Sequence, residues 1–273
     1  EAIELALLAF YLHGDLKIKE ILTCTLDRMS EGGLFDREEG GFFRYAQKQD
    51  WTAPHYEKML ADNAWLLQNY LHAYLITGKE RYQNTAQSIL AYFDAYLYDR
   101  DQGVFFGSQR ADEQYYQLRG QERRFISAPS CGKIIYTDWN ALTVSSYLKA
   151  SAVLHEQTYS DRARRALNFL RRHCVSEDED MGMLHSSHHN TSSVSWRLLG
   201  DQVHMARALL DGYQFFGDED YLTHASLLAK CLCSHFYDET GGFWDRYEDD
   251  SPKGRLGERI KPILYNALAA EFF

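Results

Sequence analysis

The sequence has little proline, no long apolar run and no excess of positive charge. Only 4 of its 273 residues are proline, and because proline in a helix interior costs about 3 kcal/mol, this scarcity suits long uninterrupted helices. No stretch approaches the roughly 18 apolar residues that a membrane-spanning helix needs. Lysine and arginine total 29 against 39 aspartate and glutamate residues, whereas a nucleic-acid-binding protein needs a basic face. We therefore expect neither a membrane nor a nucleic acid as a partner.

Several common chemical signatures are also missing. The chain has no glycine-rich phosphate loop and no nucleophile elbow, and its start has neither a basic leader nor a cleavage site. Its 5 cysteines are odd in number and irregularly spaced, which favours a reducing, cytoplasmic compartment over a disulfide framework. His185, His188 and His189 resemble a metal cluster, but the serine and asparagine residues around them are typical of a polar loop. We expect no metal and no other cofactor.

What the chain does have is a repeated helical hairpin, because apolar residues recur at spacings of three and four. In three copies an aspartate near the start of one helix is followed 20 or 21 residues later by a tyrosine of the next helix. These pairs are Asp62 and Tyr82, Asp138 and Tyr159, and Asp201 and Tyr221. Each copy is followed by glycine and an aromatic or aliphatic run, at residues 103–106, 182–185 and 241–244. Residues 1–30 look like an earlier copy, and Asn266-Ala267 begins a later one.

This repeat predicts the fold. Helices joined by such short connections run antiparallel, and a period of about 60 to 80 residues is too long for a stacked solenoid. The pattern instead suits an all-α ring of hairpins, an (α/α) toroid with one helix of each pair inside and the connecting loops around one mouth. With about three full hairpins and parts of two more, residues 1–273 are expected to form a single toroid domain, incomplete at both ends.

The repeat also places an aspartate near the start of each inner helix, so that Asp62, Asp138 and Asp201 would face the same mouth. The plain alternative is that each stabilises the helix dipole, by about 0.3 to 1 kcal/mol. For Asp201 the two readings are evenly balanced. Asp138 differs, because a threonine before it can cap the helix, and Trp139 and Asn140 after it resemble the wall of a binding site.

The densest polar stretch runs from Arg44-Tyr45 through Trp51 to Met59. Pro54 is a helix-start signal, and His55 and Asp62, seven residues apart, would share a helix face. A histidine beside carboxylates can act as a general acid or base, although His55, Glu57 and Lys58 could instead form a network that holds the loop. The candidate catalytic residues are His55, Glu57, Asp62 and Asp138. The candidate substrate-binding residues are Arg44, Tyr45, Trp51, Asn63, Trp139, Asn140, Asp201 and Trp244.

Aromatic residues make up 14% of the chain, and many fall in the expected loops. Examples are Phe42, Phe43, Phe105, Phe106 and Trp244. Aromatic faces beside carboxylates and amides commonly line carbohydrate sites, so we interpret much of this surplus as the lining of a site. The alternative is a layer of loops that packs on itself.

These motifs resemble a known family. Gly32-Gly33-Leu34-Phe35-Asp36, Gly40-Gly41-Phe42-Phe43-Arg44-Tyr45, Pro54-His55-Tyr56-Glu57-Lys58-Met59-Leu60 and Thr137-Asp138-Trp139-Asn140-Ala141-Leu142 are similar to segments of the spermatogenesis-associated protein 20-like family. The resemblance implies an (α/α)6 toroid of the six-hairpin glycosidase type, related to N-acylglucosamine 2-epimerases. It also implies a linked thioredoxin-like domain, which this sequence lacks. The activity of the family is not settled, so its link to carbohydrate is an analogy of fold.

Two kinds of function follow. The first is a sugar epimerase, isomerase or glycoside hydrolase, acting on a small sugar or glycan through acid and base residues at the mouth. The second is a non-catalytic toroid that binds a glycan or peptide beside a redox domain. Cys131-Gly132-Lys133, Arg110 and Tyr265 stand where the family tends to carry acids, which favours the second. A cyclase of lipid-like substrates is disfavoured by the aspartates at the mouth.

Overall fold

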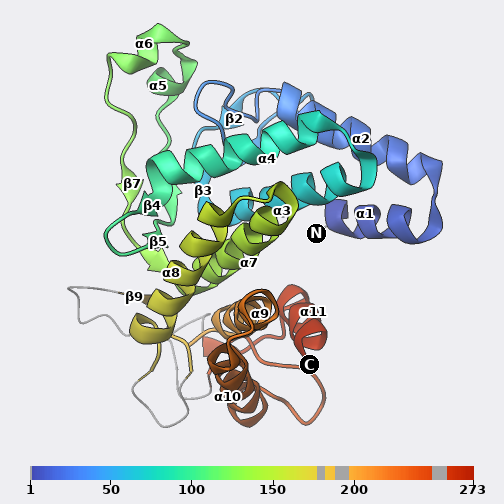
Figure 1. Ribbon diagram of the computed structural model, residues 1–273, viewed down its shortest axis with the longest axis vertical. Coiled ribbons are helices and arrows are strands. Elements are labelled where there is room, and N and C mark those ends of the chain that lie inside the picture. The colour runs from blue at the N-terminus through green and yellow to red at the C-terminus, as the bar shows by residue number, and fades with distance from the viewer. Residues whose placement is uncertain (1, 177–181, 188–196, 248–256) are drawn as a thin grey trace. The chain divides into compact units, whose positions relative to one another are not determined.

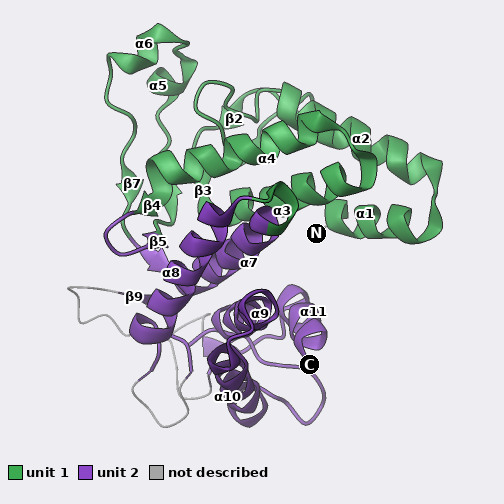
Figure 2. Cartoon of the chain, viewed as in Figure 1, with its two compact units in different colours: residues 1–99, 105–133, 152–155 green, residues 100–104, 134–151, 156–273 purple. Residues whose placement is uncertain are grey.

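The computed structural model describes residues 2–176, 182–187, 197–247 and 257–273, and most of them are helical (Figure 1). By its contacts the chain divides into two compact units (Figure 2). Unit 1 consists of residues 1–99, 105–133 and 152–155, and unit 2 of residues 100–104, 134–151 and 156–273. The single domain expected for residues 1–273 stays a prediction.

Unit 1 contains two helical hairpins, followed by an excursion with two short helices. In the first hairpin α1 packs against α2, in the second α3 packs against α4, and α1 also contacts α3. Two short antiparallel sheets, β1-β2 and β3-β6-β7, tie the loops together. The elements are α1 (Ala2–His13), α2 (Leu16–Glu31), β1 (Tyr45–Ala46), β2 (Pro54–His55), β3 (Lys58–Met59), α3 (Leu60–Thr77), α4 (Glu80–Tyr92), the π-helical turn η1 (Phe93–Leu97), β4 (Tyr98–Asp99), β5 (Val104–Phe105, its first residue counted with unit 2), β6 (Ser108–Gln109), α5 (Glu113–Gln117), α6 (Gln121–Arg124) and β7 (Cys131–Gly132).

Unit 2 contains the later copies of the hairpin. Helix α9 packs against α10, and it also contacts α8 and α11. Strands β8 and β9 pair in antiparallel fashion. The elements are β8 (Ile135–Tyr136), α7 (Thr137–Leu154, its last three residues counted with unit 1), α8 (Gln157–His173), β9 (Ser186–Ser187), α9 (Leu199–Phe216), α10 (Glu219–His235) and α11 (Ile263–Phe272).

The predicted repeat is present, with one more complete hairpin than the sequence indicated. Residues 2–31 form a whole hairpin, α1 and α2. The sequence does not delimit its first helix, because the mostly apolar α1 has no clear amphipathic period. The turns share one backbone state: Gly14, Gly78 and Gly217 adopt φ of 66° to 69°, and His155 adopts 56°. A left-handed residue is a common way to end a helix, and glycine adopts it without a Cβ penalty. His155 therefore carries strain that the three glycines avoid.

A side-chain amide anchors the loop before an inner helix in three of the copies. Asn63 accepts from the N–H of Phe42 at 2.6 Å and donates to its carbonyl at 2.9 Å. Gln202 binds both groups of Met183, each at 2.7 Å, and Asn266 binds those of Phe243 at 2.7 and 2.9 Å. Each amide also donates to the carbonyl four residues before it. The amide thus joins the glycine-rich loop to the first turn of the helix.

A lysine five residues before the amide repeats the pattern at a second level. In unit 1 the ammonium of Lys58 lies 2.7 Å from Asp36 and 2.8 Å from the carbonyl of Gly40. In unit 2 Lys261 binds Asp238 and, at 2.6 Å, the carbonyl of Gly241. Lys58 and Asp36 are buried, whereas the side chains of Lys261 and Asp238 are 25% and 20% exposed. The same lysine–aspartate pair is therefore buried in unit 1 and partly exposed to solvent in unit 2.

Replacement of Asn63 by alanine is expected to lower the free energy of unfolding by about 2 kcal/mol, because it leaves the buried N–H and carbonyl of Phe42 without hydrogen-bond partners. Urea unfolding at pH 7 measures the change. The matched variant Asn266→Ala, in a less buried copy, should cost less, since water can reach the freed groups. Equal losses of unfolding free energy in both variants would show that burial of the amide does not set the cost.

The aromatic surplus is largely core. Phe42, Phe43, Phe105, Tyr115 and Tyr116 are all at most 5% exposed. The loops fold inward because their glycines allow close approach: a Cβ on Gly41, at φ 77°, would lie 2.6 Å from the ring of Tyr92. Phe42 and Phe105 are fully buried, so the self-packing alternative holds for them, whereas Phe43 and Tyr116 line a pocket of unit 1.

Candidate active site

Strand pairing in unit 2 brings three titratable side chains together. Because β8 pairs with β9, the N–H of Thr137 donates to the carbonyl of His185 at 2.9 Å, so His185 lies beside the start of α7. The backbone N–H of Asp138 donates to Oδ1 of Asp201 at 3.2 Å. Nδ1 of His185 lies 3.2 Å from both carboxylate oxygens of Asp201. The result is a compact Asp138–His185–Asp201 centre.

The three groups shift one another's titration. Burial raises the pKa of Asp138 to about 7, and the charge of Asp201 adds to this, while His185 opposes it. Burial also raises the pKa of Asp201 against the pull of His185 and the N–H of Asp138. For His185 burial works in the other direction, but contact with Asp201 and the charge of Asp138 outweigh it and raise its pKa. At neutral pH, Asp138 is therefore poised between its acid and its base form.

Exposure assigns different roles to the two carboxylates. Asp201 is wholly buried, whereas Asp138 is 7% exposed and the side chain of His185 is 30% exposed. Oδ1 of Asp138 accepts from the N–H of Trp139 at 2.9 Å. Of the three, Asp138 and His185 retain some exposure to solvent, whereas Asp201 contacts Nδ1 of His185 from within the protein.

Aromatic rings flank this centre. The ring of Tyr136 lies 4.4 Å from that of Trp139 and 5.3 Å from that of His185, between centroids. Trp139 is partly exposed, as a wall of a site would be. Thr137, expected to cap the helix, instead donates its hydroxyl to the carbonyl of Leu184.

One nitrogen and two carboxylate oxygens from this centre lie within 4.8 Å of one another, the donor types that a divalent cation takes. Nδ1 of His185, however, is already engaged with Asp201. His188 and His189 lie outside the described residues. The expectation of no metal and no other cofactor stays a prediction.

The raised pKa values make stability depend on pH. A carboxyl with a folded pKa near 7 and an unfolded value near 3.8 binds its proton more tightly in the folded state, so stability falls as pH rises from about 4 to 7. We expect Asp138→Asn to gain about 1 to 3 kcal/mol relative to the wild type between pH 4 and pH 8. Urea unfolding at both pH values measures this. The control Asp161→Asn, at an exposed position of α8, should show no such gain, and a parallel pH profile for Asp138→Asn would refute the assignment.

In unit 1 the structure groups a second set of candidates. Arg44 forms an ion pair with Glu57 at 2.9 Å. Burial raises the pKa of Asp62, with Arg44 lowering it and Glu57 raising it further. The ring of His55 stacks on Tyr45 at 5.1 Å, and its Nδ1 is buried without a hydrogen-bond partner among the described residues. These five side chains form the polar surface of unit 1.

The remaining candidates divide by burial. Asn63 and Asn140 are fully buried, and each donates a hydrogen bond to the backbone carbonyl four residues before it. Neither side chain reaches solvent, so neither belongs to the proposed site. Trp51 is partly exposed at a backbone φ of 63°, and Trp244 is partly exposed beside Arg259 and Lys261.

Sequence reasoning missed several residues. The residues around His185 are typical of a polar loop, and only its position just before the paired strand β9 indicates its contact with Asp201. Asp36 and Arg123, partners in a buried ion cluster with Lys58, lie 87 residues apart, and no spacing rule connects them.

Among the described residues, no helix is both long and apolar enough to cross a membrane.

The fold is that of the α/α-toroid enzymes. An unsaturated glucuronyl hydrolase from Bacillus sp. GL1 superimposes with a TM-score of 0.74 at 13% identity, over 98% of this chain and 70% of that one. A cellobiose 2-epimerase from Bacillus thermoamylovorans gives 0.72 at 9% identity, over 89% and 61%. A family 76 glycoside hydrolase (mannosidase) from Bacteroides thetaiotaomicron gives 0.70 at 14% identity, over 99% and 67%. The predicted (α/α)6 toroid class is confirmed, and at these identities the likeness concerns the fold alone.

In sequence, the chain is similar to spermatogenesis-associated protein 20. It is 40% identical to the Homo sapiens protein and 41% identical to the Mus musculus protein, in each case over 88 residues. The matched segment is 32% of this chain and 11% of those relatives, so this chain matches about a tenth of their length. The resemblance to this family is confirmed. No protein-family model matches the chain.

Proposed function

We propose that unit 2 carries the acid and base centre of an enzyme that acts on a sugar or a glycan. The observation that carries this proposal is the contact of Asp138, His185 and Asp201, with the pKa of Asp138 raised to about 7. A general acid or base works best when its pKa lies near the working pH. The sugar epimerases and glycoside hydrolases that share the fold support the substrate class as an analogy.

In this proposal Asp138 exchanges the proton. As a hydrolase, the protonated form of Asp138 gives its proton to the oxygen of the leaving sugar, while a water molecule adds to the anomeric carbon and gives its proton to neutral His185. As an epimerase or isomerase, the ionised form removes a proton next to the carbonyl of an open-chain sugar, and His185 returns one. Asp201 holds Nδ1 of His185, so that the other ring nitrogen is presented to solvent. Trp139 offers a partly exposed ring as a binding wall beside the centre.

The polar surface of unit 1, with Trp51, is proposed to bind hydroxyl groups of a sugar. Arg44 and Tyr45 are exposed, and Glu57 and Asp62 are partly exposed, so donors and acceptors are both available there. Trp244 is proposed as a further aromatic contact. The catalytic role predicted for His55, the single toroid domain and the linked thioredoxin-like domain stay predictions.

The test is incubation with a panel of aldoses, N-acylhexosamines and oligosaccharides, followed by analysis of the products. We expect one class to be epimerised, isomerised or hydrolysed. Binding without any product would favour the non-catalytic glycan- or peptide-binding toroid, and neither binding nor product with any member would argue against a sugar ligand.

A further inference from the structure

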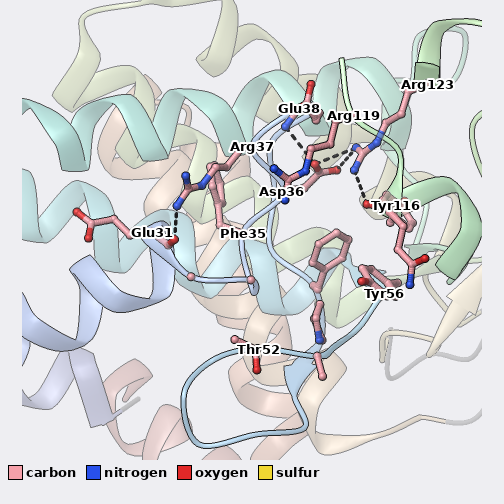
Figure 3. A pocket seen from close by; sticks show the side chains of 16 residues that line it. Glu31, Phe35, Asp36, Arg37, Glu38, Thr52, Tyr56, Tyr116, Arg119 and Arg123 are labelled. Carbon is pink, nitrogen blue, oxygen red and sulfur yellow. Dashed lines mark hydrogen bonds and ion pairs between the residues drawn. The ribbon is translucent and has the colours of Figure 1, made fainter. Parts of the chain in front are cut away.

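Unit 1 contains a pocket of about 520 Å³ that takes no part in the function proposed above (Figure 3). It lies between the turn after α2, the loop before β2 and the segment that carries α5 and α6. Pockets that hold small molecules usually measure about 300 to 1,000 Å³. The size is therefore that of a small-molecule site.

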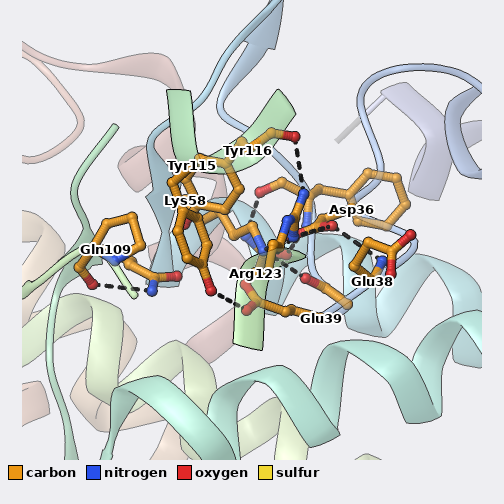
Figure 4. Close-up of polar contacts among 12 residues, drawn as sticks. Asp36, Glu38, Glu39, Lys58, Gln109, Tyr115, Tyr116 and Arg123 are labelled. Carbon is orange, nitrogen blue, oxygen red and sulfur yellow. Dashed lines mark hydrogen bonds and ion pairs between the residues drawn. The ribbon is translucent and has the colours of Figure 1, made fainter. Parts of the chain in front are cut away.

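A buried ion cluster fixes one wall of the pocket (Figure 4). Both oxygens of Asp36 accept from Arg123, at 2.8 and 2.9 Å, and one also accepts from Lys58 at 2.7 Å. Burial raises the pKa of Asp36, but the charges and hydrogen bonds of Lys58 and Arg123 hold it below its usual value. Nε of Arg123 donates to the carbonyl of Leu118, and its Nη2 donates to that of Tyr116. Arg123 also lies 3.5 Å from Glu39, so the two cations of the cluster are balanced by two carboxylates.

A second wall is aromatic. The rings of Tyr56 and Tyr116 stack at 5.7 Å with planes 5° apart, and Phe43 packs its edge at 5.0 Å against both. Tyr56 and Phe35 are partly exposed, so they offer apolar surface to the pocket. A ligand with a ring suits this wall.

The third wall is a strained loop. Trp51 and Ala53 both have positive φ, at 63° and 51°, and such residues cost about 1 to 3 kcal/mol each. The N–H of Gly33 donates to the carbonyl of Trp51 at 3.1 Å, which holds the loop in place. Strain of this kind gathers where a backbone is shaped around a ligand, and Thr52 and Ala53 of this loop line the pocket.

The rim decides what kind of group the pocket prefers. Its acids have partners already, since Glu38 accepts from the N–H of Gly120 at 3.0 Å and Glu31 lies 3.4 Å from Arg81. Its two outer arginines lack a carboxylate: Arg37 donates to the carbonyl of Glu31, and the guanidinium of Arg119 contacts no described residue through a hydrogen bond or ion pair. The planar guanidinium is suited to a carboxylate, which it can bind through two hydrogen bonds.

We propose that this pocket binds a small hydroxylated ring that carries a carboxylate, of which a uronic acid is the simplest. The ring lies against the aromatic wall, the carboxylate meets Arg119 and Arg37, and the hydroxyl groups donate to the rim glutamates. The proposal does not depend on the acid and base centre of unit 2.

The test is calorimetric titration of the whole chain with glucuronate and, as the uncharged comparison, with glucose. We expect glucuronate to bind and glucose to bind at least about tenfold more weakly. Arg119→Gln should weaken glucuronate binding about tenfold, because it removes the charged donor. The matched variant Arg110→Gln changes the same charge at an exposed position of unit 1 that does not line the pocket, and it should bind as the wild type does.

Binding of glucuronate that is unchanged in Arg119→Gln, or matched by glucose, would overturn the proposal, as would no binding of glucuronate at millimolar concentration. Asp138→Asn separates this site from the one in unit 2. Glucuronate affinity that persists in Asp138→Asn places the ligand in the pocket, and affinity lost there but kept in Arg119→Gln assigns the ligand to the acid and base centre instead.

Discussion

Replacement of Lys58 by methionine is expected to lower the free energy of unfolding by about 3 to 5 kcal/mol, the usual cost of removing one partner from a buried ion pair. Lys58 is fully buried, lies 2.7 Å from Asp36 and donates to the carbonyl of Gly40. Its ammonium also lies 4.4 Å from the ring centroid of Tyr92. Methionine fills much of the space but leaves Asp36 with Arg123 alone and the carbonyl of Gly40 without its donor. Urea unfolding at pH 7 measures the loss.

The repeat supplies the control. Lys261→Met removes the same contacts from the equivalent loop of unit 2, where water reaches both members of the pair. A solvated pair contributes about 0 to 1 kcal/mol, so this variant should be far milder. A loss below about 1 kcal/mol for Lys58→Met, or equal losses for the two variants, would show that burial does not set the cost.

The ion pair of Lys58 shows which contacts could be predicted from the sequence and which could not. The hairpins and their order were predictable, because helical periodicity and the repeated aspartate-to-tyrosine spacing are local properties of the chain. The network interpretation of His55, Glu57 and Lys58 was only partly right: Lys58 holds the loop, but its partner is Asp36, and Glu57 pairs with Arg44 instead. Which ion pair forms depends on tertiary burial, and no local pattern encodes that.

The candidate site shows the same division. The first-turn positions of Asp138 and Asp201 followed from the repeat, and the structure brings these two aspartates together. His185 did not follow, because its contribution depends on the pairing of two-residue strands that are too short to leave a period of two in the sequence. The contacts of Asn63 depend on tertiary structure in the same way, because its amide binds both backbone groups of Phe42, 21 residues before it in the chain.

Substitution of Asp138 by asparagine is expected to reduce turnover of any sugar substrate by about 10²- to 10⁴-fold, the usual contribution of one general acid or base. Asparagine keeps the shape of the side chain and can still accept from the N–H of Trp139, but it cannot exchange a proton. The pH variant described above indicates whether Asp138→Asn still folds, so a loss of turnover in a folded variant is attributable to chemistry. The rate should be measured from pH 5 to pH 9, since the wild-type profile is expected to change slope near pH 7.

Asp62→Asn is the matched comparison, because Asp62 occupies the corresponding first turn of α3, and burial raises its pKa too, but no histidine is in contact with it among the described residues. If Asp138 is the proton-exchanging group, Asp62→Asn should leave kcat close to the wild-type value. A kcat loss confined to Asp62→Asn would move the acid and base centre to unit 1. Full activity in both variants would leave neither carboxylate a catalytic role and would contradict the proposal that Asp138 exchanges the proton.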